Sequence, residues 1–110
     1  DNIMAVQFRT GPQLRQPTDY INALNLVANV SERVPIPDGR TFVVFSCTAN
    51  YYVRVGDNSV TAAVPGDVSD GSASELNPLS YILHGNSNNT HISVITSSNA
   101  ICTMAFYDVV

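Results

Sequence analysis

The 110-residue chain contains no lysine and no tryptophan, and only 13% of its residues are charged. A typical soluble domain has about 25% charged residues, so this chain is unusually neutral. The absence of lysine excludes Schiff-base chemistry. Few, scattered arginines and a formal net charge of −4 argue against a nucleic-acid partner. No stretch of 18 apolar residues is present, so we expect no transmembrane helix and no membrane partner.

The sequence also lacks the motifs of common enzymes. It contains no nucleophile elbow, no Gly-rich phosphate loop, no Cys-x-x-Cys and no His-Glu-x-x-His. His84 and His91 flank a polar turn, but two histidines without a third ligand do not form a zinc site. Asp67, Asp70 and Glu75 share one polar segment, yet their spacing matches no calcium-binding loop. We therefore expect neither an enzyme nor a bound metal or other cofactor.

The few charges are unevenly placed. Residues 1–54 contain five arginines and four acids (+5 − 4 = +1), whereas residues 55–110 contain five acids and no basic residue (−5). This difference in sign either orients a partner or reflects chance among few charges. Arg9 and Arg15 in the N-terminal stretch are candidate partner contacts. Arg54 is either an interface arginine or an outward-facing strand residue in water.

What the sequence does contain is a β-strand pattern. Asn, Ser and Thr make up about a quarter of the residues and surround runs of β-branched and aromatic residues. The apolar run at 41–48 is apolar on both faces, so it should be a central strand. We expect strands at 24–31, 41–48, 51–55, 60–64, 79–83, 91–95 and 100–107.

The spacing of these strands predicts the fold class. Strands recur every 8–12 residues between turns rich in Gly, Asn, Asp and Pro, which is typical of an all-β antiparallel β-sandwich or jelly-roll-like fold. A short helix over residues 18–24 is an alternative for the first element. Pro12 and Pro17 interrupt any regular ladder near the N-terminus. We therefore divide the chain into an extended N-terminal arm, 1–19, and a single β-sandwich domain, 20–110.

Two pairs of residues in the predicted strands bear on the core and on partner contacts. Cys47 and Cys102 both lie in apolar runs, so we expect buried free thiols rather than a disulfide. Tyr51 and Tyr52 are adjacent and must point to opposite faces of their strand. One of them belongs in the core and the other can contact a partner. Tyr51, together with Arg54, is our candidate contact on this strand.

Several segments, in order, resemble one type of virion protein. They are an apolar-Pro turn ending in Asp-Gly at 34–39, an Ala-Asn-Tyr-Tyr-Val-Arg-Val-Gly element at 49–56, Val-Thr-Ala at 60–62, and Thr-His-Ile-x-Val-Ile at 90–95. The segment from residue 24 to 107 resembles the small capsid decoration proteins, also called staple or cement proteins, of tailed bacteriophages of the epsilon-fifteen-like podovirus type.

The resemblance implies a function without catalytic residues. It implies a structural protein on the outer capsid surface, made in the bacterial cytoplasm, that bridges neighbouring major capsid subunits as a homodimer, with a trimer as the alternative. Free cysteines agree with synthesis in a reducing compartment. The alternative function is a tail, neck or head-fibre module that contacts a host surface glycan, because exposed Asn, Ser and Tyr suit sugar recognition.

Overall fold

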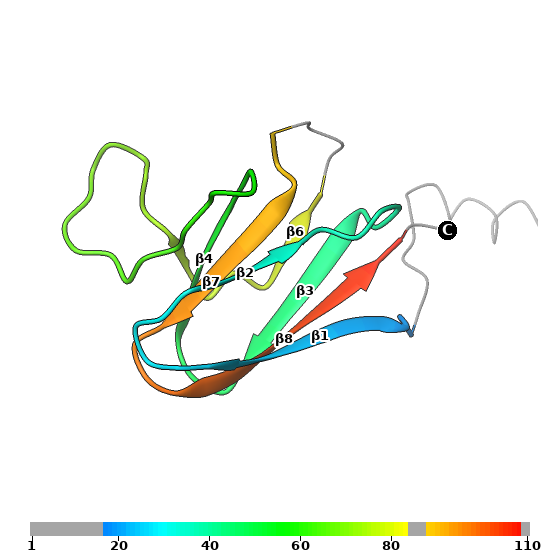
Figure 1. Cartoon of the computed structure of the whole chain (residues 1–110), viewed down its shortest axis with the longest axis horizontal. Coiled ribbons are helices and arrows are strands. Elements are labelled where there is room, and N and C mark those ends of the chain that lie inside the picture. Colours follow the sequence, from blue (N-terminus) through cyan, green and yellow to red (C-terminus); the bar gives the residue numbers. More distant parts are fainter. Residues whose placement is uncertain (1–16, 84–87, 109–110) are drawn as a thin grey trace, which may run out of the picture.

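The computed structural model describes residues 17–83 and 88–108, and these residues form eight strands and no helix. Two antiparallel four-stranded sheets contain all of the strands (Figure 1). This confirms the all-β prediction and is compatible with a β-sandwich. The strands are β1 (Tyr20–Leu26), β2 (Glu32–Pro35), β3 (Phe42–Cys47), β4 (Tyr51–Gly56), β5 (Glu75–Leu76), β6 (Ser80–Ile82), β7 (His91–Thr96) and β8 (Ala100–Tyr107).

The chain passes repeatedly between the two sheets. The first sheet has the strand order β1-β8-β3-β6 and the second has the order β2-β7-β4-β5. Only β4 and β5 are both consecutive in sequence and paired with each other. Every other pairing joins strands that are distant in the chain, so the fold depends on long-range contacts. The described residues include no helix long and apolar enough to cross a membrane.

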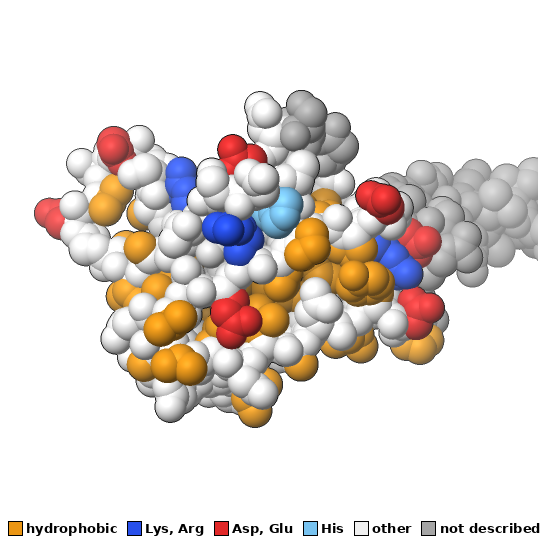
Figure 2. All heavy atoms as spheres, in the orientation of Figure 1, with side chains coloured by type: hydrophobic (Ala, Val, Ile, Leu, Met, Phe, Trp, Pro, Cys, Tyr) orange, Lys and Arg blue, Asp and Glu red, His pale blue; other side chains and the backbone are white. Residues whose placement is uncertain are grey.

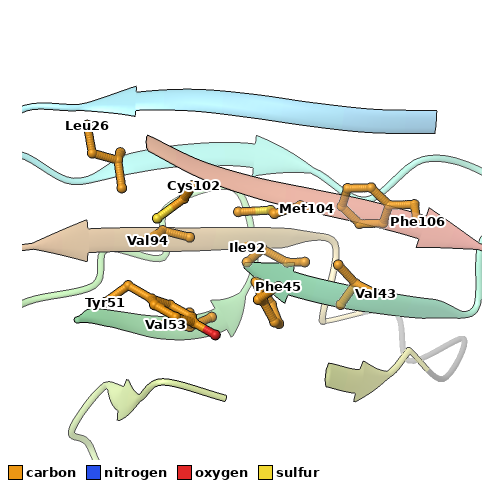
Figure 3. Close-up of a cluster of buried hydrophobic side chains, with 10 residues drawn as sticks. All are labelled: Leu26, Val43, Phe45, Tyr51, Val53, Ile92, Val94, Cys102, Met104 and Phe106. Carbon is orange, nitrogen blue, oxygen red and sulfur yellow. The ribbon is translucent and has the colours of Figure 1, made fainter. Parts of the chain in front are cut away.

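The core lies between the facing surfaces of the two sheets (Figure 3). Every second residue of β8 points inward, and Cys102, Met104 and Phe106 are almost fully buried. Ile92 and Val94 of β7 meet them from the second sheet. Full burial of one such side chain contributes about 1.5–3 kcal/mol, so this interface between the sheets is the main source of stability.

Most of the predicted strands are present. The prediction of a central strand at 41–48 is confirmed, since β3 lies between β8 and β6. The predicted strand at 100–107 is also confirmed as β8, and its residues 102, 104 and 106 lie on the buried face. The helix considered for 18–24 is wrong, because β1 occupies most of that range.

Three strand predictions are wrong. Residues 60–64 form no strand and instead cross the second sheet, where the Ala62 amide donates to Ser93 Oγ at 2.8 Å. A polar turn between the strands expected at 79–83 and 91–95 would suit a hairpin, but these strands, β6 and β7, belong to different sheets and do not pair. The strand expected at 24–31 ends at Leu26, and a separate strand, β2, begins at Glu32.

The prediction of free cysteines is wrong as well. Cys47 of β3 and Cys102 of β8 are register partners with their Cα atoms 4.0 Å apart, and they form a disulfide. They are 55 positions apart in the sequence, so only the pairing of β3 with β8 reveals that they are neighbours. Cys102 is buried and Cys47 is half-buried, which agrees with the expected location in apolar strands.

Two turns depend on residues with positive φ. Gly39 (φ 78°) follows Asp38, and the Arg40 amide donates to the Pro37 carbonyl at 3.3 Å, as expected for an Asp-Gly turn. Asn77 (φ 51°) joins two segments: its amide donates to the Tyr51 carbonyl at 2.8 Å, and its Oδ1 accepts from the Tyr51 amide at 2.9 Å. Asn77 therefore continues the β4–β5 pairing beyond the last residue of β5.

Candidate interaction surfaces

The outer face of the first sheet presents a row of uncharged side chains on each of its four strands. Because Cys102, Met104 and Phe106 point inward, the alternate residues of β8 and their register partners on β1, β3 and β6 point outward. None of these outward positions is charged. They are Ile21, Ala23 and Asn25 of β1, Ile101, Thr103, Ala105 and Tyr107 of β8, Phe42, Val44 and Ser46 of β3, and Ser80 and Ile82 of β6. We call this surface the neutral face.

Large aliphatic side chains on the neutral face are exposed. Ile82 is 66% exposed, Ile21 58% and Ile101 51%. They are distributed over three strands, so the apolar surface extends across the sheet and is not a single isolated residue. Isolated surface hydrophobics are common, whereas a contiguous apolar surface indicates a contact with another molecule.

The second sheet differs because its own chain covers part of its outer face. Ser93 of β7 faces outward, and the loop between β4 and β5 lies over it, with Ala62 buried there. Arg33 and Arg54 are the register partners of Ser93 on either side. The Arg33 guanidinium donates to the Val60 carbonyl at 3.0 Å, which fastens the same loop.

Charges also gather at one end of the molecule. Arg40 pairs with Asp19 at 3.1 Å, donates to Thr18 Oγ1 at 3.1 Å, and lies over the Tyr20 ring with 5.6 Å from Cζ to the ring centroid. Thr18 in turn donates to the Phe106 carbonyl. In Figure 2 the charged side chains lie along the upper part, near the centre and at the right-hand end, and the lower left is hydrophobic or uncharged. Residues 18 and 19, assigned to the arm from sequence, thus contact the sheet.

The four residues predicted as partner contacts have different positions. Arg9 and Arg15 lie outside the described residues. Tyr51 is only 6% exposed, so its side chain offers little surface to a partner, in contrast to the role expected for it. Arg54 is half-buried, and its guanidinium donates to the carbonyls of Ser72 and Ala73, with 3.1 Å to the latter.

Tyr51 is a structural residue of the core. Its ring packs against Phe45 with 6.1 Å between centroids, and its hydroxyl donates to the Pro78 carbonyl. Burial raises the pKa of the Tyr51 phenol, and the nearby Glu75 carboxylate adds to that shift. Tyr52 is half-exposed on the opposite side of β4, where the sequence argument requires the second tyrosine to be.

The acidic residues of the loop are held by local hydrogen bonds. Asp70 accepts from the Ser72 hydroxyl and amide at 2.6 and 3.1 Å, and Asp57 accepts from Ser59 at 2.6 and 2.9 Å. These bonds stabilise the carboxylates and lower the pKa of both aspartates. Within the described segments no three His, Cys, Asp or Glu side chains converge as metal ligands, and His84 lies outside those segments.

A cleft of about 490 Å³ opens between the edges of β4 and β6. Its lining includes Arg54 together with three polar residues that the sequence argument did not select for binding, namely Glu75, Tyr81 and Asn89. The pairing of β5 with β4 ends at Glu75, so the edge of β4 beyond Val53 has no neighbouring strand within the described residues. No short motif marks this site, because its residues come from three separate segments.

Comparisons with protein-family models, with curated proteins and with solved structures find no match to this chain.

Proposed function

We propose that this protein is a virion structural protein that decorates the assembled capsid and stabilises it by bridging neighbouring major capsid subunits. The observation that carries the proposal is the neutral face, an exposed apolar surface without a charged side chain. The cores of protein interfaces are depleted in charged residues, and this face has the same composition. No catalytic role, cofactor, nucleic acid or membrane enters the proposal.

The size of the neutral face suggests that a second contact is needed. Four strands spaced about 4.8 Å apart and on average about six residues long cover roughly 380 Å² in projection. Each partner in a standard interface buries roughly 800 Å². In our proposal the N-terminal arm, residues 1–19, supplies the additional contact, with Arg9 and Arg15 as its charged groups. A proline-rich arm loses less conformational entropy on binding than a flexible one.

The strand order supports a finer description of the domain, residues 20–110, as a jelly roll. Two four-stranded sheets in the orders β1-β8-β3-β6 and β2-β7-β4-β5 are what an eight-stranded chain folded as two Greek keys produces. Jelly rolls occur in viral capsid proteins and in lectins. Because a fold does not determine a function, this agreement is secondary to the neutral face.

The proposed mechanism is mass action on the assembled shell. A homodimer, or alternatively a trimer, that contacts two adjacent subunits binds the assembled lattice and not the separated subunits. Any ligand that binds one state selectively stabilises that state. The protein is made in the bacterial cytoplasm and acts on the outer capsid surface.

Adding the protein back to stripped capsids tests the function directly. We expect re-decorated capsids to rupture at a higher temperature than bare ones. Affinity should fall only weakly between low and high salt, because the neutral face contributes no charge and ionic screening acts only on the two arginines of the arm. Light scattering during heating measures the first effect and co-sedimentation measures the second.

Copy number then separates the two candidate roles. A decoration protein should be present in hundreds of copies per virion, which band quantification of purified particles reports. A few copies and an unchanged rupture temperature would favour the tail, neck or head-fibre module. If binding is lost at modest salt concentrations, the protein would still be a capsid decoration protein. The contact would then depend on the charge difference between the two halves of the chain and not on the neutral face.

A truncated chain tests the arm. Removal of residues 1–16 leaves Thr18 and Asp19, which contact the sheet, so we expect an unchanged β signal in circular dichroism. Capsid binding should weaken by about tenfold or more, since the arm is proposed to supply one of two contacts. The matched control is the double variant Arg9→Ala/Arg15→Ala in the full chain, which isolates the charges. Full binding by the truncated chain would remove the arm from the mechanism.

A further inference from the structure

The cleft between β4 and β6 carries an inference that goes beyond capsid decoration. Its volume of about 490 Å³ lies within the range of small-molecule sites, about 300–1,000 Å³. One wall is the β4 edge with Arg54 and Val55, and the facing wall is the β6 edge with Tyr81 and Leu83. Because these walls belong to different sheets, the cleft is held in shape by the packing of the whole domain.

The polar groups in the cleft combine donors with acceptors. The Tyr81 hydroxyl donates to one oxygen of the Glu75 carboxylate, which leaves the second oxygen as an acceptor. The Asn89 side chain supplies a donor and a further acceptor. Arg54 lines the cleft as a residue of the β4 edge, but its side chain points to the outer face of the second sheet, where Nη1 donates to the Ser72 and Ala73 carbonyls.

These groups are held in fixed positions. The Tyr81 ring packs edge-on against Phe45 with 5.4 Å between centroids and an interplanar angle of 81°. Burial raises the pKa of the Tyr81 phenol, and the hydrogen bond to Glu75 raises it further. The phenol therefore stays protonated at neutral pH and keeps its bond to the carboxylate. A preorganised site of this kind loses little entropy when a ligand binds.

We propose that the cleft binds a neutral saccharide through Glu75 and Asn89. Each sugar hydroxyl both donates and accepts, and the cleft offers both kinds of group within one small volume. The apolar side chains of Val55 and Leu83 match the C–H surface of a sugar ring. The alternative ligand is an extended peptide added along β6. It is disfavoured because β6 has only three residues and so offers few edge groups for pairing.

Protein-observed NMR with the full, oxidised chain tests the assignment. The probes are D-glucose, D-galactose, N-acetyl-D-glucosamine and maltose, each titrated separately. We expect at least one probe to produce saturable shifts confined to amides of residues 53–55, 73–75, 81–83 and 89. The assay needs no capsid, so its result is independent of the decoration role.

Variants of the polar groups make the test specific. Glu75→Gln and Asn89→Ala should each weaken binding of that probe by about tenfold, because each removes a hydrogen bond to the ligand. The matched controls Glu32→Gln and Asn58→Ala make the same chemical changes outside the cleft and should leave affinity unchanged. Amide spectra of every variant verify that the fold is retained.

Three results would overturn the proposal. The first is the absence of saturable shifts for all four sugars. The second is equal weakening by the control variants, which indicates non-specific binding. The third is saturation by an alternating Val-Thr peptide with shifts along β6 and no competition from any sugar, which would assign the cleft to strand addition.

Discussion

Reduction of the Cys47–Cys102 disulfide is expected to lower the free energy of unfolding by about 4 kcal/mol. The bond joins residues 55 apart in sequence. In the chain-entropy account, closing a loop of this length lies between the roughly 3 kcal/mol for 15 residues and 4.7 kcal/mol for 100. For a domain of this size each kcal/mol shifts the melting temperature by about 4–8 °C. The reduced protein should therefore melt about 15–30 °C below the oxidised one.

Chemical denaturation with and without a reductant measures the effect. Reduction changes the linkage but leaves both side chains in place, so little of the loss comes from altered packing. The double variant Cys47→Ala/Cys102→Ala should be insensitive to reductant and about as unstable as the reduced protein, or less stable. Thiol labelling of the denatured, unreduced chain should find both cysteines blocked. Equal stability of the fully reduced and oxidised proteins would contradict the prediction.

Under the proposed function, this disulfide makes the stability of the protein differ between the host cell and the released particle. A chain made in a reducing cytoplasm begins with both thiols free. Because the bond is expected to supply several kcal/mol, a newly made protein is less stable than the same protein in a released particle. Stabilisation of the decoration layer would then increase after the virion leaves the host cell.

The sequence predicted the elements of this fold better than their partners. The alternation in residues 100–107 identified β8, because the strand period of two is a local property, but it did not show which face is buried. The pairing of β3 with β8 and of β2 with β7 joins distant segments, and no local signal encodes it. The same reason explains the error about the cysteines. Their pairing becomes visible only when the register places Cys47 opposite Cys102.

The candidate surfaces could be predicted only in part from the sequence. The outward residues Ile101, Thr103, Ala105 and Tyr107 lie on a strand that the sequence predicted, but the neighbours of that strand, β1 and β3, were unknown. The sequence of a strand with apolar residues on both sides fits two situations. The strand can be buried on both sides, or one of its sides can be an exposed binding surface. Burial alone separates the two cases, and Ile101 proves to be half exposed.

Tyr51 illustrates the same limit on a smaller scale. Adjacent tyrosines must face opposite ways, so the sequence correctly required one buried and one exposed ring. It did not show which sheet β4 joins, and therefore which side of β4 faces the core. Tyr51 packs inside against Phe45, and Tyr52 takes the exposed position.

A single charge on the neutral face should abolish most capsid binding. Ile101→Arg places a guanidinium at a position that is 51% exposed in the free protein, so the fold should tolerate it. In a complex that buries the face, the arginine would be desolvated without a partner, which costs several kcal/mol. A loss of 3 kcal/mol corresponds to roughly a hundredfold weaker binding. Co-sedimentation with stripped capsids over a range of concentrations measures the affinity.

The control must carry the same charge on a different surface. Val68 is 43% exposed in the loop between β4 and β5, far in sequence from the strands of the neutral face, so Val68→Arg should bind as the unmodified chain does. Ile21→Arg, on β1 of the same face, should repeat the loss. Melting temperatures within about 3 °C of the unmodified chain establish that the variants are folded.

If Ile101→Arg and Ile21→Arg both bind normally, the neutral face is not the contact, and the arm becomes the principal candidate. If Val68→Arg also binds weakly, the effect follows added positive charge and not the position, and the argument from an uncharged interface fails.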